Sequence, residues 1–215
     1  MKIRVGIIGL AVMAAAGCLQ KETGHTLYLS PDGMVSWMVV EKDVYSDTED
    51  RAARSQEEQE YLASAARDAH GIGRALLLLD PADLRTRIVR HERPFVVTTE
   101  ARYPSVERLG RDLMVRLGLD GEVTLHREGP VMTLRVKLDV SAALASEEAR
   151  EPDNPVDTLV DDLDRYKVVL TEGRFTNARG FTLSADGTQA MFAKTPWEAI
   201  EANGGIVELA LSWPR

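Results

Sequence analysis

Cysteine occurs once in the 215 residues, at position 18. With one thiol the chain forms no internal disulfide, and a zinc site built on several thiolates is excluded. A folded domain of this chain must therefore be held together by its apolar core alone, which is feasible at this length. The composition agrees, since 44% of the residues are hydrophobic and 28% are charged, as in ordinary globular proteins.

Short catalytic motifs are also missing. The chain contains no Gly-x-Ser-x-Gly, no Ser-x-x-Lys and no glycine-rich phosphate loop. It has four histidines, none at a metal-binding spacing from another: His25, His70, His91 and His126. We therefore predict no metal and no organic cofactor, and these absences favour a binding module over an enzyme.

The charge of the chain is acidic. There are 26 basic and 34 acidic residues, a formal net charge of -8. Because Lys2 and Arg4 lie in the N-terminal segment, residues 18–215 hold 24 basic against 34 acidic groups, a net charge of -10. Such a domain repels phosphate backbones, which argues against a nucleic-acid partner and against broad adhesion to anionic lipid.

The N-terminus has the three-part pattern of an export signal. Residues 1–4 carry two positive charges, residues 5–16 are uncharged and apolar, and small residues precede Cys18. The apolar run is about a dozen residues long, shorter than the roughly 20 that span a hydrocarbon core. This length favours removal of the segment over its retention as a membrane helix.

The residues Ala15-Ala16-Gly17-Cys18 resemble the lipobox of bacterial lipoproteins, with Ala15 where that class prefers a larger aliphatic residue. The resemblance covers residues 1–18 only. It implies that residues 1–17 are cleaved off, that Cys18 receives a diacylglyceryl group on its sulfur, and that the chain is exported and anchored in a membrane by lipid. Leu19 follows rather than Asp, which in a Gram-negative bacterium favours the periplasmic face of the outer membrane.

The mature chain is expected to lie close to its membrane. We expect residues 18–24 to form a short tether that reaches roughly 20 Å when extended. Residues 25–215 are then expected to form a single domain, with a mobile loop near 141–155 where glutamates and prolines gather.

Hydrophobic periodicity predicts the elements of this domain. Alternating apolar residues predict strands at 25–29, 34–44, 85–89, 95–103, 122–125, 132–140, 167–171, 180–183, 188–192 and 207–213. Helical spacing predicts a helix in two pieces over 48–79, opened by a capping box at Ser46 and Glu49, and further helices over 105–117, 156–166 and 195–204. The sum is an α+β fold, an antiparallel β-sheet of hairpins with about four helices packed on it.

One feature above the background is a group of arginines. Five of them concentrate positive charge over two neighbouring predicted strands: Arg85, Arg87, Arg90, Arg93 and Arg102. Because a guanidinium presents a planar fork of donors, this patch is a candidate anion-binding surface for a lipid headgroup, a cell-wall carboxylate or an acidic partner. The favoured alternative is internal pairing with five acids of the first predicted helix: Glu49, Asp50, Glu57, Glu58 and Glu60.

The second feature is aromatic and rich in sulfur. Tyr28, Met34, Trp37 and Met38 all fall in the predicted hairpin that follows the anchor. Such side chains rest at a bilayer interface, line an apolar pocket or pack in a core. Core packing is the favoured interpretation.

Three functions fit these observations. The first is a non-enzymatic, lipid-anchored envelope protein that binds or scaffolds a partner protein, a cell-wall polymer or a lipid ligand at the membrane surface. The second is a lipid-binding or amphiphile-binding module with an apolar cavity between sheet and helices. The third is a hydrolase that uses carboxylates such as Glu100 or Glu172, because enzymes of that kind carry no short motif.

The lipobox resemblance makes a direct prediction about the mature N-terminus. Intact-mass measurement of the protein from its own membranes should give residues 18–215 plus a diacylglyceryl group, and Cys18→Ser should release the chain from the membrane. An unmodified N-terminus at any residue other than Cys18 would contradict the assignment.

Overall fold

Two β-sheets and three helices make up the described part of the chain. The computed structural model describes residues 19–141, 166–193, 200 and 202–215. The first sheet has seven strands in the order β3-β4-β2-β1-β7-β10-β9, and the second has four in the order β5-β6-β11-β8.

The bounds of the elements follow chain order. The first half of the chain holds β1 (Leu19–Leu29), β2 (Val35–Ser46), α1 (Arg51–Ala65), α2 (Gly71–Leu77), β3 (Asp83–Arg90), β4 (Phe95–Tyr103) and α3 (Val106–Leu117). The second half holds β5 (Asp120–Glu128), β6 (Val131–Asp139), β7 (Tyr166–Leu170), β8 (Asn177–Arg179), β9 (Phe181–Leu183), β10 (Gln189–Phe192) and β11 (Ile206–Pro214).

Local sequence signals account for most of these elements. Gly33, with a φ of 95°, turns β1 into β2, and the amide of Ser30 donates to the carbonyl of Met34 to close the hairpin. Ser105 caps α3 by accepting hydrogen bonds from the amides of Glu107 and Arg108, and Gly118 ends the helix in the left-handed region. The predicted hairpins and the two-piece helix over 48–79 are confirmed.

The α+β class is confirmed, but the arrangement of strands is not a single antiparallel sheet. β1 pairs with β7 in parallel, so the first sheet is mixed, and β5, β6, β8 and β11 form a second sheet. Parallel neighbours need a long connection between them, and β7 is far from β1 in the chain. Periodicity identifies strands but carries no information on which distant strand becomes the neighbour.

The predicted number of about four helices exceeds the three that the described residues contain. The helix expected over 156–166 and the loop expected near 141–155 lie almost wholly outside the described residues, and Tyr166 instead begins β7. The helix expected over 195–204 also lies largely outside them. At α1, Asp50 rather than Ser46 is the N-cap, because its carboxylate accepts from the amide of Ala53 at 2.7 Å.

The expected tether over 18–24 is wrong for residues 19–24, which form the first half of β1. Leu19 pairs with Ser46 and Gly24 pairs with Val40 across the hairpin. The polar residues of this half do not show a strand pattern by themselves; the strong strand signal of β2 provides the partner. Cys18 lies outside the described residues.

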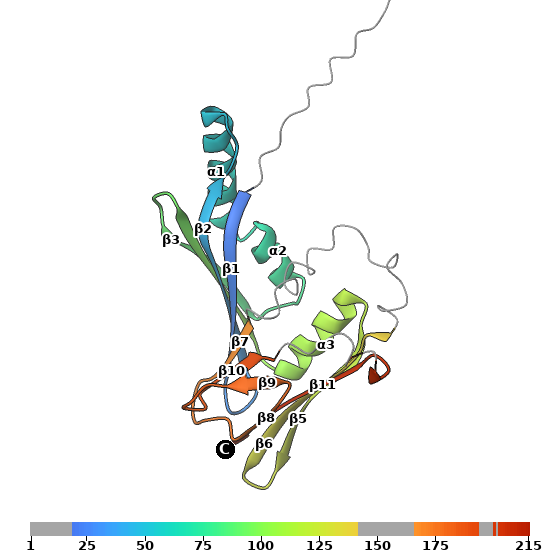
Figure 1. The fold of residues 1–215 in the computed structure, drawn as a ribbon. Coiled ribbons are helices and arrows are strands. Elements are labelled where there is room, and N and C mark those ends of the chain that lie inside the picture. Colours follow the sequence, from blue (N-terminus) through green and yellow to red (C-terminus); the bar gives the residue numbers. More distant parts are fainter. Residues whose placement is uncertain (1–18, 142–165, 194–199, 201) are drawn as a thin grey trace, which may run out of the picture.

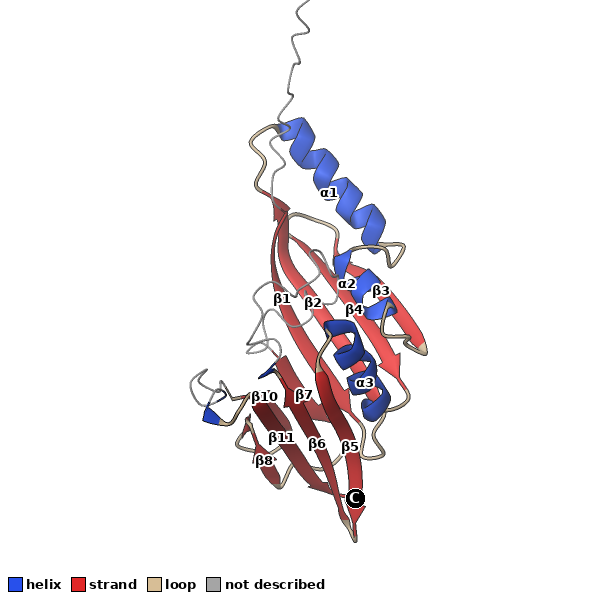
Figure 2. Ribbon diagram, turned by 90° about the vertical axis from the view of Figure 1, so that its right-hand side faces the viewer, coloured by secondary structure: helices blue, strands red, loops and turns tan. Residues whose placement is uncertain are grey.

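One continuous core joins the two sheets. α1 and α2 lie on one side of the first sheet, and α3 lies on the second sheet beside β5 (Figures 1 and 2). Trp37 of the first sheet and Trp213 of the second are both fully buried in this core, with Leu76 of α2 and Leu109 of α3. The ring of Phe175 meets that of Trp213 edge-on, with centroids 6.0 Å apart.

Within the described ranges, no helix has both the length and the apolar character needed to cross a membrane.

The core position of Trp213 makes a stability prediction. Trp213→Ala should lower the free energy of unfolding by about 3–5 kcal/mol, because it removes a large buried ring at the junction of the sheets. Urea denaturation measures this. The matched substitution Val115→Ala, at a side chain that is 73% exposed, should change it by no more than about 0.5 kcal/mol. A small effect at Trp213 would mean that the sheets do not share a core.

Candidate functional site

The face of the seven-stranded sheet turned away from α1 and α2, here called the outer face, brings both sequence features together. Strand register places three ladders of side chains on it. They are Arg87, Thr98, Val40 and Gly24; Arg85, Glu100, Met38, Thr26, Lys167 and Met191; and Asp83, Arg102, Ser36, Tyr28 and Val169. The alternate residues, such as Glu41 and Thr99, point to the inner face and are buried beneath the helices.

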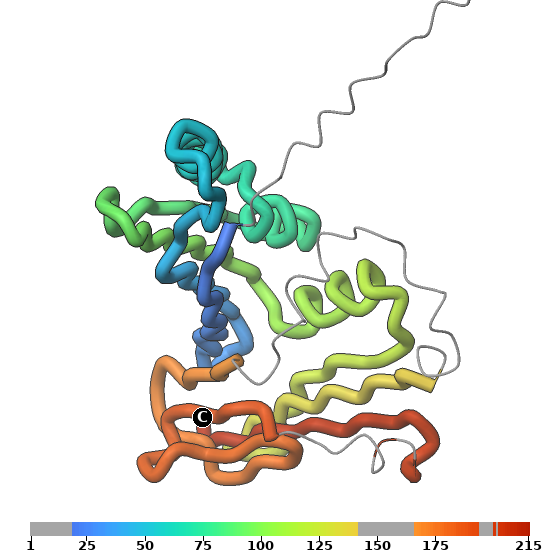
Figure 3. The backbone as a smooth tube through the Cα atoms, turned by 45° about the horizontal axis from the view of Figure 1, so that its top comes forward, coloured from blue at the N-terminus to red at the C-terminus, as the bar shows by residue number. Residues whose placement is uncertain are grey.

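No described helix covers the outer face. α1 and α2 lie together on one side of the strands when the molecule is viewed from above (Figure 3). At Gly24, the position of an added Cβ has no atom within 4 Å beyond its chain neighbours. Met191 is 43% exposed. Among the described residues, the outer face is thus an open sheet surface made by six strands: β3, β4, β2, β1, β7 and β10.

Three of the five predicted patch arginines lie on this surface. Arg85 and Arg102 form ion pairs within it, to Asp83 at 3.1 Å and to Glu100 at 3.0 Å. Arg87 forms no ion pair with any residue in the described part of the chain, and neither does Lys167. Within the described residues these are the two cations of the outer face without a direct ion pair, and Arg87 acts on Glu100 only through its charge.

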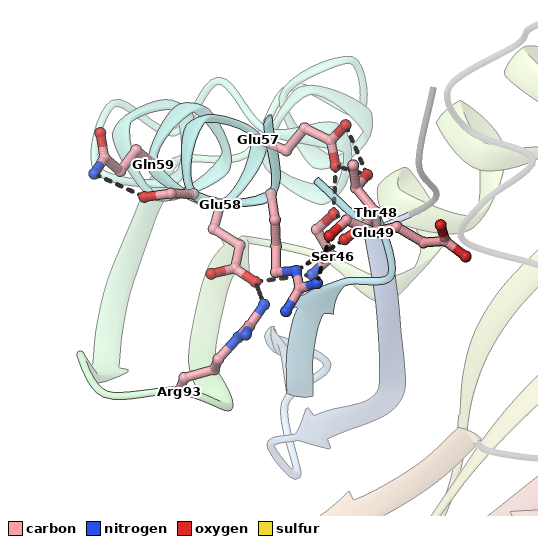
Figure 4. A network of polar contacts seen from close by, with 9 residues as sticks. Ser46, Thr48, Glu49, Glu57, Glu58, Gln59 and Arg93 are labelled. Carbon is pink, nitrogen blue, oxygen red and sulfur yellow. Dashed lines mark hydrogen bonds and ion pairs between the residues drawn. The ribbon is translucent and has the colours of Figure 1, made fainter. Parts of the chain in front are cut away.

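The other two arginines lie elsewhere. Arg93 pairs with the largely buried carboxylate of Glu58 on α1, and the same carboxylate accepts the backbone amide of Ser46 at 3.0 Å (Figure 4). Internal pairing with the first helix is thus correct for Arg93. Among described residues, no ion pair joins the patch arginines to the other four acids considered: Glu49, Asp50, Glu57 and Glu60. Arg90 ends β3 as an exposed side chain.

The aromatic and sulfur-containing residues of the first hairpin are likewise only partly on the outer face. Tyr28 and Met38 lie half-buried on the outer face, in the same ladders as Arg102 and Arg85 and two strands away from them. Trp37 is 1% exposed and packs in the core, as favoured from the sequence. Met34 is 54% exposed in the β1–β2 turn.

The carboxylates considered for a hydrolase do not have the environment of a general acid. Glu100 accepts hydrogen bonds from Ser36 and Arg102, and these contacts hold the pKa of its carboxyl below the usual value. A general acid requires a raised pKa. Glu172 is an exposed residue outside the strands.

A buried ion cluster on the inner face was not predicted from the sequence. Glu41 of β2 is 1% exposed, and its Oε1 accepts a hydrogen bond from Lys21 of β1 at 2.5 Å. Its Oε2 accepts from the hydroxyl of Tyr61 on α1 at 2.9 Å and faces Nε2 of His70, the N-cap of α2, at 3.0 Å. The available signal was Glu41 itself, a charge on the same side of a predicted strand as Trp37 and Val39.

The electrostatics of this cluster keep Glu41 ionised. Burial alone would raise the pKa of its carboxyl, but the hydrogen bond with His70 and the charge of Lys21 outweigh burial and lower the pKa to about 2. Burial and the adjacent carboxylate raise the pKa of Tyr61. Both oxygens of Glu41 are occupied by donors, so the cluster acts as a structural clamp rather than as a catalytic acid or base.

In the described part of the chain, the contact between α2 and the first sheet is closely packed. Ile72, Ala75 and Leu76 of α2 are at most 3% exposed where they face the sheet. A hollow of about 410 Å³ lies instead on the surface, lined by Asp43, Tyr45, Arg93 and Pro94. These observations do not support an amphiphile cavity between sheet and helices.

The four histidines are not brought together. His25 is buried, stacked on Tyr166 with centroids 4.3 Å apart, and its Nδ1 accepts from the indole N–H of Trp37 at 3.3 Å. His70 belongs to the ion cluster, and His91 and His126 are exposed. In the described ranges no three His, Cys, Asp or Glu side chains gather as metal ligands would.

Comparison with known proteins adds little. No family model matches the chain, and no curated protein matches it. A solved structure that is similar is the NMR structure of the folded domain of LppM from Mycobacterium tuberculosis, at 10% identity and a TM-score of 0.39, covering 92% of this chain and 91% of that one. A similarity of this size does not establish that two proteins share a fold.

The ion cluster predicts an acid-sensitive fold. The folded-state pKa of Glu41 lies below its usual value of 4.5, so its contribution to stability is present above pH 4.5 and is lost as the pH falls toward 2. Glu41→Gln should destabilise the fold at pH 7, because Lys21 loses its counter-charge, and should flatten the loss between pH 4.5 and 2.

Urea denaturation at a series of pH values measures this. Glu122→Gln is the matched control, since Glu122 is exposed on β5, and its curve should follow that of the unaltered protein. Parallel curves for the Glu41→Gln variant and the unaltered protein would show that Glu41 is not the acid-sensitive group.

Proposed function

We propose that this chain is a non-enzymatic, lipid-anchored protein of the bacterial envelope, which binds through its outer face at the membrane surface. In a Gram-negative bacterium the proposed location is the periplasmic face of the outer membrane. The observation that carries the proposal is the open outer face, where arginines and apolar side chains gather on six strands of a chain whose one cysteine stands in a sequence that resembles a lipobox.

The chemistry of this face limits what it binds. Arg87 and Lys167 offer charge to an anion, Tyr28 and Met38 offer apolar surface on the two strands between them, and Met191 adds apolar surface beyond Lys167. An envelope protein with acidic side chains, a cell-wall carboxylate and an amphiphile with an anionic head all fit this pattern. The amphiphile is the second candidate, because the half-buried apolar side chains Tyr28, Met38 and Val169 offer it a contact surface on the outer face. Binding of this kind requires no closed cavity.

The proposal is tested by photocrosslinking in living cells. A benzophenone side chain at Thr98, beside Arg87 on the outer face, should yield adducts whose class, protein, glycan or lipid, is read by mass spectrometry. The same group at Leu77, which is 50% exposed on α2 across the sheet, is the control and should yield none of these adducts. Equal adducts at both positions, or none at Thr98, would contradict a binding role for the outer face.

A further inference from the structure

The start of the domain is held rigidly at the anchor. Leu19, the residue after Cys18, pairs with Ser46, and the side-chain amide of Gln20 donates from Nε2 to the carboxylate of Asp47 at 2.9 Å. Lys21 is bound to the buried Glu41. If Cys18 carries lipid, as the proposed function requires, no slack chain separates the acyl group from the sheet, so only a few orientations of the domain on the bilayer are accessible.

One such orientation stands the domain on the end where β1 begins. The N-terminal end of α1 extends past the sheet there (Figure 2). The loop that leads into it carries three acids and no cation over residues 47–50: Asp47, Glu49 and Asp50. With Arg51 and Arg54 in the first turn of α1, this tip carries three acids and two cations, and its excess of one negative charge disfavours this orientation on a membrane that contains anionic headgroups.

The outer face has the opposite charge. Four cations and two acids lie on its ladders: Arg85, Arg87, Arg102 and Lys167 against Asp83 and Glu100. This excess of positive charge occurs in a chain whose formal net charge is -8. The overall acidity of the chain therefore does not describe the surface that lies alongside the anchored strand.

The apolar side chains of this face suit a bilayer interface. Tyr28 and Met38 lie half-buried at its centre, and Met191 is 43% exposed beyond them on β10. Aromatic and flexible apolar groups flanked by cations are the composition of surfaces that rest among headgroups. The Gly24 position of β1 leaves the backbone itself open on the same face.

We infer that the outer face is the membrane-contacting surface of this protein, and that the anchored domain lies with this face on the bilayer, arginines toward the lipid phosphates and α1 and α2 away from it. This inference rests on the proposed function and names the bilayer itself as the partner. A protein or a cell-wall polymer on the same face would be a different outcome.

The inference demands contact far from the anchor. Met191 of β10 pairs with Lys167 of β7, which pairs in turn with Thr26 of β1. Thr26 is seven residues from Leu19 along β1, a distance of about 23 Å at about 3.3 Å per residue. Lipid at Cys18 cannot by itself bring Met191 to the membrane. Only the flat orientation does so.

The single cysteine of the chain makes the experiment clean. When lipid occupies the Cys18 sulfur, one introduced cysteine is the sole thiol available to an environment-sensitive fluorophore. Three lipidated variants, Met191→Cys, Leu77→Cys and Ala52→Cys, report the outer face, the helix side and the acidic tip, respectively. Each is placed in vesicles of phosphatidylcholine and phosphatidylglycerol that contain doxyl-labelled lipid.

The expected result is a blue shift and quenching of the label at residue 191, with neither change at residues 77 and 52. Changes at residue 52 alone would mean that the domain stands on its tip, and no change at any site would mean that the outer face is free for a soluble partner; both outcomes overturn the inference. Labelling of unmutated protein at Cys18 would instead show that lipid is absent, which is a failure of the proposed function.

Charge reversal separates the arginines from the anchor. In the lipidated Met191→Cys background, Arg85→Glu with Arg87→Glu should reduce quenching on vesicles that contain phosphatidylglycerol, and added salt should do the same. Arg111→Glu with Arg127→Glu, at exposed residues of α3 and β5, is the matched control and should leave quenching unchanged. Equal losses in both pairs would contradict a specific role for the outer face.

Discussion

The carboxylate of Glu41, enclosed by Lys21, Tyr61 and His70, is the contact on which the layered structure depends. Its four groups come from β1, β2, α1 and the start of α2, so one charge joins the first strand and two helices to the sheet. Taking an ion out of water is costly, and a buried pair is no guarantee of extra stability. The cluster disfavours any arrangement in which these elements shift apart, because the buried carboxylate of Glu41 would then lack one of its donors.

This clamp determines which surface remains for binding. Because α1 and α2 are fixed to the inner face, they cover that side of the first sheet, and no described helix covers the other side. The side chains of the outer face are consequently those of a strand surface that meets solvent, yet Tyr28, Met38 and Val169 are not the polar residues that such a surface usually carries. An open sheet with apolar and cationic side chains is the feature of this protein that most needs a partner to explain it.

Sequence periodicity predicted the local elements well and their assembly less well. The hairpin turn at Gly33, the cap at Ser105 and the alternation in β6 are set by neighbouring residues, and these predictions are confirmed. The parallel pairing of β1 with β7 depends on residues far apart in the chain, which no local pattern encodes.

The candidate site shows the same limit. The sequence identified Arg85, Arg87 and Arg102 together with Tyr28 and Met38, but as two separate features, because only the register of β1, β2, β3 and β4 reveals that they share a face. Lys167 entered that face through the unpredicted β7 pairing. Arg93 meets Glu58 of α1 through a tertiary contact that composition does not encode, whereas Arg102 pairs with Glu100 two residues away on its own strand β4.

The pairing of Leu19 with Ser46 also has a consequence in time. A lipobox is processed by enzymes that must reach the peptide bond before the cysteine and the cysteine sulfur itself. If Cys18 is such a site, closure of the hairpin at Leu19 competes with that access, because a strand residue already held in a sheet is a poor substrate. Lipid attachment and cleavage would then come before the final pairing of β1 with β2 at Leu19 and Ser46. Maturation and folding of this end would form an ordered sequence in which the chain is attached to the membrane first.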